Sequence, residues 1–117
     1  MQLEIPPTPN AKSPTKWEDL VTGAFALSAR QNDGKPLHGR SCQPELKLCN
    51  AAVVFRRDDG VDVMVRRAED PTGKTVSRDV CEFNKFGDVR ICVNWDTGVS
   101  IREMKNDHGD WIKVGDE

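Results

Sequence analysis

Apolar and polar residues alternate along most of the chain after Ala51, in runs of about six to eight residues. Side chains of a strand point alternately to its two faces, so each run reads as a strand with one buried face. The runs end at turn sequences that contain Gly60, Gly73, Gly87, Gly98 and Gly109. We therefore expect an all-β fold with at most one short helix. About six or seven strands would form an antiparallel meander, either as a small barrel that hides its edges or as a strongly twisted open sheet.

The register of the central hairpin follows from a turn centred on Phe86 and Gly87. This turn places Cys81 directly opposite Cys92. A shift of one residue would move every apolar side chain to the other face, so the sorting of apolar residues supports this register. The other pairs that it creates are Val80 with Val93, Glu82 with Ile91 and Phe83 with Arg90.

A second hairpin is centred on the loop of residues 58–60, which has the sequence Asp-Asp-Gly. Glycine in the last position supplies the left-handed backbone that a three-residue loop requires. The loop pairs Phe55 with Val63 on one face and Val54 with Met64 on the other. Both faces are then apolar at matching positions, which supports this register.

Two later turns extend the meander. Residues 96–98 read as another three-residue loop, which pairs Val93 with Ile101. Residues 106–109 can form a loop of three or of four residues. We expect four, because this choice keeps Ile112 on the same face as Ile101.

The N-terminal region has a different composition from the rest of the chain. Residues 1–16 contain four prolines among polar residues, and proline removes backbone donors and disfavours helix. We expect an extended or disordered tail there, followed by a single β-rich domain of residues 17–117.

The first two elements of that domain are less well defined by pattern. Alternation over residues 20–30 predicts a first strand. Residues 15–18, Thr-Lys-Trp-Glu, also fit the capping box that begins a helical turn. Between Cys42 and Cys49, the early Pro44 suits either a short helix or an edge strand, and the pattern does not decide between them.

Composition excludes several classes of protein. The 117 residues carry a net charge of −2 with both signs interspersed, so no overall field attracts nucleic acid or an anionic membrane. No run is long and apolar enough for a membrane-spanning helix. The sequence Gly-Lys-Thr at residues 73–75 lacks the first glycine of a phosphate-binding loop. We expect no cofactor.

The four cysteines suggest two disulfide bonds. Their spacing differs from the short Cys-x-x-Cys pairs that hold a metal ion, so we expect no metal site. The alternatives are paired cystines and buried thiols in a cytosolic protein. Directly opposed strand residues lie within the reach of a disulfide, which favours a bond between Cys81 and Cys92. The two remaining cysteines, Cys42 and Cys49, would then bond each other. Cystines would favour a periplasmic or secreted protein.

Candidate catalytic groups are few. His108 lies in a turn between Asp107 and Asp110, an arrangement that could orient a general base. The same residues are also typical of an exposed turn. His38 has no sequence motif around it. We assign no catalytic residue, and we keep a small hydrolase using His108 or His38 with nearby carboxylates as the alternative function.

A binding surface is the favoured functional prediction. In the expected registers, one face of the sheet collects aromatic residues, arginines and a methionine, the composition of protein interaction surfaces. The alternative is an ordinary solvated face whose arginines pack over their neighbours. The predicted binding residues are Phe83, Arg90, Arg102, Met104 and Trp111. They indicate a non-catalytic binding or inhibitor-like module with a protein partner.

Overall fold

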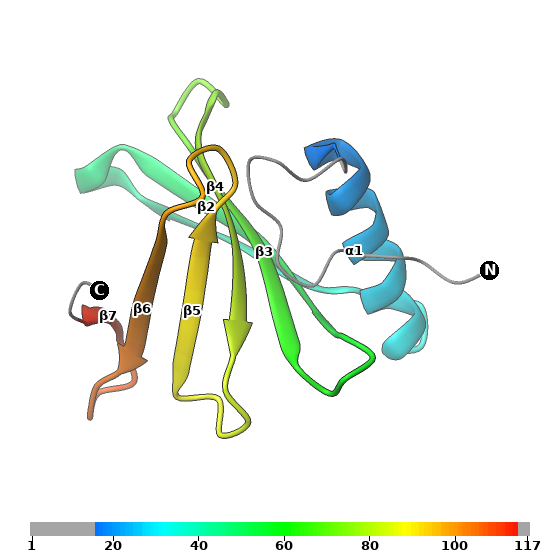
Figure 1. Ribbon diagram of the computed structural model, residues 1–117. Helices are drawn as coiled ribbons and strands as arrows, with labels where there is room; N and C mark the ends of the chain where they lie inside the picture. Colours follow the sequence, from blue (N-terminus) through cyan, green and yellow to red (C-terminus); the bar gives the residue numbers. More distant parts are fainter. Residues whose placement is uncertain (1–15, 115–117) are drawn as a thin grey trace.

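The computed structural model describes residues 16–114, which form one α-helix and a seven-stranded antiparallel sheet (Figure 1). Each strand pairs with the next one along the chain, so the sheet is a simple meander. The predicted all-β meander with one helix is confirmed. The predicted N-terminal tail lies, apart from Lys16, outside the described residues. The elements are α1 (Trp17–Gln31), β1 (Leu37–Gln43), the 3-10 turn η1 (Pro44–Leu46), β2 (Leu48–Arg56), β3 (Asp62–Glu69), β4 (Thr75–Phe83), β5 (Val89–Asn94), β6 (Ser100–Lys105) and β7 (Trp111–Val114).

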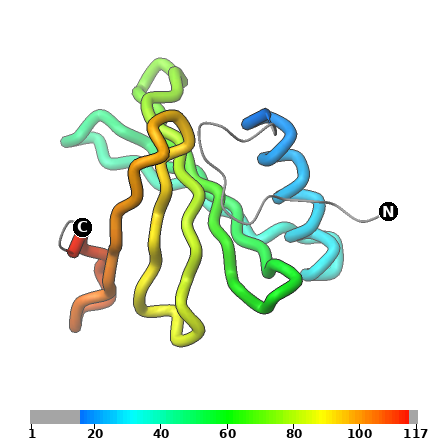
Figure 2. Tube along the Cα trace, in the orientation of Figure 1, coloured from blue at the N-terminus to red at the C-terminus, as the bar shows by residue number. Residues whose placement is uncertain are grey.

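The sheet curls into an open half-barrel. Figure 2 shows the hairpin of β1 and β2 running across the back of β4 to β6, as the right-handed twist of a long meander requires. Within residues 16–114, β1 and β7 remain edge strands and do not pair with each other. Of the two expected arrangements, the open twisted sheet is therefore the one adopted. The helix α1 covers the outer face of the curl, chiefly over β2.

The strand predicted for residues 20–30 is wrong, because α1 occupies this segment. The buried side chains Trp17, Leu20, Ala24 and Ser28 of α1 lie three or four positions apart, which is the spacing of one helical face. Over a few residues, the observed alternation fits both the two-residue period of a strand and the longer period of a helix. The local pattern therefore could not distinguish a strand from a helix here. The members of the buried face are Trp17, Leu20, Gly23, Ala24 and Ser28.

The main hydrophobic core lies between α1 and the outer face of the sheet. Leu20 and Ala24 are fully buried against valines and a phenylalanine of β2 to β4. The indoles of Trp17 and Trp95 meet edge to face, with 5.4 Å between ring centroids. The strand residues of this core are Val53, Phe55, Val63, Val65 and Val80, and Trp95 joins them from the loop after β5.

The two hairpin registers on which the sequence analysis depended are confirmed. Phe55 opposes Val63, and Cys81 opposes Cys92. Gly60 adopts φ +87°, the left-handed conformation that the three-residue loop needs. Both predicted disulfides form: Cys81 bonds Cys92 and Cys42 bonds Cys49.

The segment between Cys42 and Cys49 combines both of its expected alternatives. Cys42 lies near the end of β1 and Cys49 near the start of β2, and these two strands pair. Pro44 begins the short turn η1 between them.

The two C-terminal turns exchange their expected lengths. Asn94 N–H donates to the carbonyl of Val99, so the first loop holds four residues, 95–98. Asn106 N–H donates to the carbonyl of Asp110, so the second holds three, 107–109. The cause of the longer first loop is Trp95. Its buried indole faces α1, and its backbone N–H donates to the carbonyl of Arg78.

These loop lengths change the faces of β6 and β7. Ile101 opposes Cys92 rather than Val93, so Ile101 lies on the disulfide face. Ile112 opposes Met104 and lies on the α1 face. The expected shared face of Ile101 and Ile112 is therefore wrong.

Candidate binding surface

The inner face of the half-barrel carries the Cys81–Cys92 disulfide and a broad groove. The groove has a volume of about 980 Å³ and is lined from β1, β2, β3, β5 and β7. Residues of both edge strands line one hollow because the sheet curls toward this face. We call this surface the concave face. Its lining includes Leu37, Ser41, Val54, Met64, Arg66, Arg90 and Trp111.

Three of the predicted binding residues meet on the concave face. The guanidinium of Arg90 lies 4.0 Å from the centre of a Trp111 ring and 5.7 Å from that of Phe83. The two aromatic rings also meet edge to face, with centroids 5.7 Å apart. An arginine held over aromatic faces gains cation–π attraction, which increases when the pair is desolvated.

The other two predicted binding residues lie on the opposite face. Arg102 opposes Ile91 and Met104 opposes Val89 on the strand pair β5–β6, so both point to the outer side of the curl. On the part of this face that α1 does not cover, they form an exposed strip with Ile91 and Ile112. The prediction of one shared face is thus wrong for Arg102 and Met104, because the loop before β6 contains one more residue than expected.

Charged side chains connect the floor of the concave face. Arg66 on β3 binds Asp79 at 3.1 Å and Glu103 at 3.5 Å, and Arg90 donates to the same Glu103 at 2.6 Å. In a flat sheet β3 and β6 would lie about 14 Å apart. The contact between Arg66 and Glu103 therefore shows that the sheet curls and brings these two strands closer together. All four side chains are at most 18% exposed.

Burial also affects the protonation equilibrium of Arg90. Desolvation lowers the pKa of Arg90 below its usual value, and the nearby charge of Arg66 lowers it further. The hydrogen bond that Arg90 donates to Glu103, together with the negative charge of Glu103, raises the pKa of Arg90 and so acts in the opposite direction. The guanidinium stays charged at neutral pH because an arginine pKa starts so high.

A small apolar cluster supports this charged network from below. Cys81 and Cys92 are 0% and 1% exposed, and they pack with Met64. Phe83 and Ile101 pack against the same cluster from its sides. The disulfide therefore fixes β4 and β5 beneath the residues that form the groove.

Sequence reasoning missed Arg66 and Glu103 as members of this surface. A four-residue loop at 95–98 places Glu103 opposite Arg90. The sequence analysis gave four residues to the later loop at 106–109 instead, so it did not bring Glu103 to this surface. Arg66 opposes Asp79 across β3 and β4, a pair of opposite charges at matching positions that local pattern could have indicated.

The two histidines lie in different surroundings. The ring of His38 packs against Phe25, with 5.3 Å between centroids, and the backbone N–H of His108 donates to Asn106. Among residues 16–114, neither imidazole is hydrogen-bonded or ion-paired to a carboxylate.

The part of the chain that the structure describes lacks two kinds of feature. It contains no group of three or more histidine, cysteine, aspartate or glutamate side chains placed to hold a metal ion. Between Lys16 and Val114, no helix combines the length and the apolar character needed to cross a bilayer. Comparisons of the chain with models of protein families, with curated proteins and with solved structures found no match.

Proposed function

We propose that this protein is a non-catalytic, inhibitor-like binding module that holds a protein partner on its concave face. The observation that carries the proposal is the stack of Phe83, Arg90 and Trp111 beside a groove of about 980 Å³. Aromatic and arginine side chains dominate the binding energy of many protein interfaces.

The rigidity of the surroundings supports the same proposal. Arg90 is held by Glu103 and by two rings, and the strands beneath it are joined by a disulfide. Side chains that are already fixed lose little conformational entropy when a partner binds, so more of their contact energy remains as affinity. The groove, with a volume of about 980 Å³, has room for several side chains of a partner.

The two disulfides bear on where the module would act. Such bonds persist mainly in oxidising compartments, and both join neighbouring strands of this small domain. We therefore place the proposed binding activity outside the cytosol, in a periplasm or an extracellular space.

The test compares the two faces of the sheet. Tagged protein captures partners from native extract, and the bound proteins are identified by mass spectrometry with Trp111→Ala and Arg102→Ala run in parallel. Trp111→Ala should lose the wild-type partner, whereas Arg102→Ala, on the other face, should retain it. Circular dichroism melting checks that both variants are folded.

Three outcomes would overturn the proposal. Loss of the partner in Arg102→Ala but not in Trp111→Ala would move the binding surface to the outer strip. Equal capture of the partner by both variants would show that Trp111 on the concave face does not contribute to binding. A hydrolytic activity that His108→Ala or His38→Ala abolishes would establish the alternative enzyme function.

A further inference from the structure

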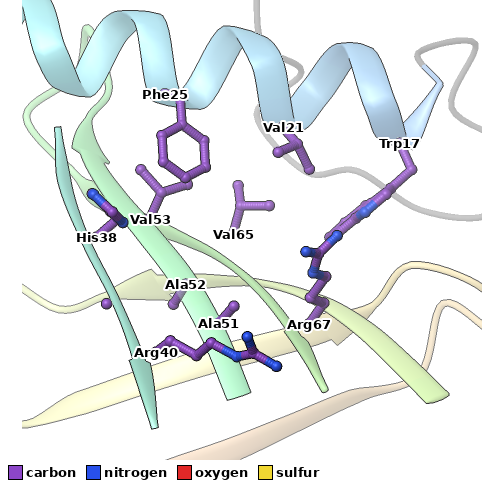
Figure 3. A pocket seen from close by; sticks show the side chains of 11 residues that line it. Trp17, Val21, Phe25, His38, Arg40, Ala51, Ala52, Val53, Val65 and Arg67 are labelled. Carbon is purple, nitrogen blue, oxygen red and sulfur yellow. The ribbon is translucent and has the colours of Figure 1, made fainter. Parts of the chain in front are cut away.

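A second hollow lies on the other side of the sheet, between α1 and strands β1 to β3, and encloses about 300 Å³ (Figure 3). Its walls are mainly apolar: Trp17, Val21 and Phe25 descend from α1, and Val53 and Val65 face them from the sheet. It is smaller than the concave groove and lies between two packed elements rather than on one open face, which suits a small molecule.

The polar end of this hollow is formed by one row of opposed residues. Arg40, Ala51 and Arg67 lie directly opposite one another across β1, β2 and β3. The short side chain of Ala51 leaves open the space between the two longer ones, and both guanidiniums lie along this edge of the hollow (Figure 3).

A single buried carboxylate holds both arginines. Glu69, which is 7% exposed, accepts from Arg40 at 3.1 Å and from Arg67 at 2.9 Å. Two guanidiniums on one carboxylate leave one positive charge in excess. The arginine side chains are 59% and 45% exposed, so each retains donors that are free to bind an anion.

The remaining lining adds no negative charge. The ionisable side chains that line the hollow are Arg40, Arg67 and His38, all of which are bases. Arg78, the next residue in the row after Arg67, is paired with Asp96 and does not draw on Glu69. Charge and shape together therefore favour a ligand with an apolar body and a single anionic end.

We propose that this hollow binds a medium-chain monocarboxylate, with its alkyl chain between α1 and the sheet and its carboxylate against Arg40 and Arg67. Guanidinium and carboxylate groups match in geometry and form strong charge-assisted hydrogen bonds. A group the size of a water molecule occupies about 30 Å³ in a liquid. The hollow of about 300 Å³ therefore has room for about ten non-hydrogen atoms, the number in octanoate. This site opens on the opposite face of the sheet from the proposed partner surface, although His38, Gly39, Arg40 and Ala52 border both hollows.

The test titrates the full chain with octanoate below its micelle concentration and follows binding by isothermal calorimetry and by intrinsic fluorescence, to which Trp17, Trp95 and Trp111 all contribute. We expect one molecule to bind per chain. Octylammonium and 1-octanol carry the same chain with a cationic or a neutral end, and acetate carries the end alone. All three should bind at least about tenfold more weakly, the loss expected when a charged hydrogen-bonded end or the buried chain is absent.

Variants locate the site within the protein. Arg40→Gln and Arg67→Gln should each weaken octanoate binding about tenfold while leaving 1-octanol unchanged. Each single variant leaves Glu69 one arginine partner, which protects the fold. Ala51→Leu should block both ligands by filling the space, and Arg102→Gln, on the uncovered part of the same face, should change neither.

The proposal is overturned by any of three results. They are absence of octanoate binding to the wild-type chain, equal affinity for octanoate and octylammonium, and unchanged octanoate affinity in both arginine variants. A loss of partner capture in Trp111→Ala would not change any of these three results. The octanoate site and the partner surface are therefore tested by different experiments.

Discussion

Single polar side chains determine where several strands of this protein end. Asp70 is the clearest case: its Oδ1 accepts from the Thr72 hydroxyl at 2.6 Å and from the N–H groups of Thr72 and Lys74 at 2.9 and 3.0 Å. Asn94 and Asn106 act in the same way, each accepting two backbone N–H groups of its own turn. Donors that the strand ladder leaves unpaired are thereby satisfied.

Asp70 should make stability depend on pH in the acidic range. The Thr72 hydroxyl above all, and the N–H of Lys74, hold the pKa of Asp70 below its ordinary value. The folded state therefore binds a proton less readily than the unfolded chain. This contribution is complete above about pH 5 and disappears as the pH falls through the folded pKa.

Replacement of Asp70 by Asn should lower the urea midpoint at pH 7 and have little effect at pH 2. The matched control is Asp107→Asn, in an exposed turn where no contact of the carboxylate is found among residues 16–114. It should leave both midpoints unchanged. An equal loss for Asp70→Asn at both pH values would show that the charge of Asp70 is not what stabilises the turn.

At the scale of elements, α1 is held to the sheet by packing and by two polar contacts at its C-terminal end. Ser28 Oγ accepts from the N–H of Leu37, and the Gln31 side chain bonds both backbone groups of Arg56. Most of the attachment comes from the apolar face, in which Leu20 is 1% exposed. A short helix has little stability of its own, so it depends on this packing.

The Leu20→Ala substitution should cost about 2–5 kcal/mol of unfolding free energy, because it removes buried atoms and leaves a cavity in the main core. Leu46→Ala makes the same chemical change at a side chain that is 60% exposed in η1, and should change stability by less than about 0.5 kcal/mol. Urea denaturation followed by far-UV circular dichroism measures both. Similar losses in the two variants would contradict the assignment of residues 17–31 to a packed helix.

At the scale of the whole molecule, the sheet has a protected centre and open edges. Every residue of β1 is exposed, whereas β3 and β4 each contain strongly buried positions. One disulfide lies in each of these two environments. Cys42–Cys49 joins an edge strand to its neighbour, with Cys42 exposed, and Cys81–Cys92 lies buried in the inner cluster.

Mild reductant should therefore open Cys42–Cys49 well before Cys81–Cys92 in the folded protein. Thiol–disulfide exchange requires access to a sulfur atom, which a buried bond gains only through opening of the structure. Timed alkylation followed by peptide mapping gives the order. Each bond closes a short loop and should contribute about 2–3 kcal/mol. Alkylation of Cys81 and Cys92 first, or of all four cysteines together, would contradict this description of the sheet.

The amino-acid sequence by itself determined the meander, the two hairpins centred on residues 58–60 and on Phe86–Gly87, and both disulfides. These features depend on contacts between residues close in the chain, where the two-residue period of a strand and the chemistry of a turn act together. Phe83 and Arg90 could be placed on one face for the same reason, because one short turn separates their strands.

Tertiary structure alone decided the remaining features. Residues 17–31 form a helix because their three-to-four spacing matches the valines of β2 to β4, which are far away in the sequence. Trp95 lengthens its loop because its indole packs on Trp17, and this one residue moves Arg102 and Met104 to the opposite face. The curl of the sheet then joins Trp111 to Phe83 and Arg90 and creates the groove. Each of these outcomes depends on long-range packing, which local periodicity does not report.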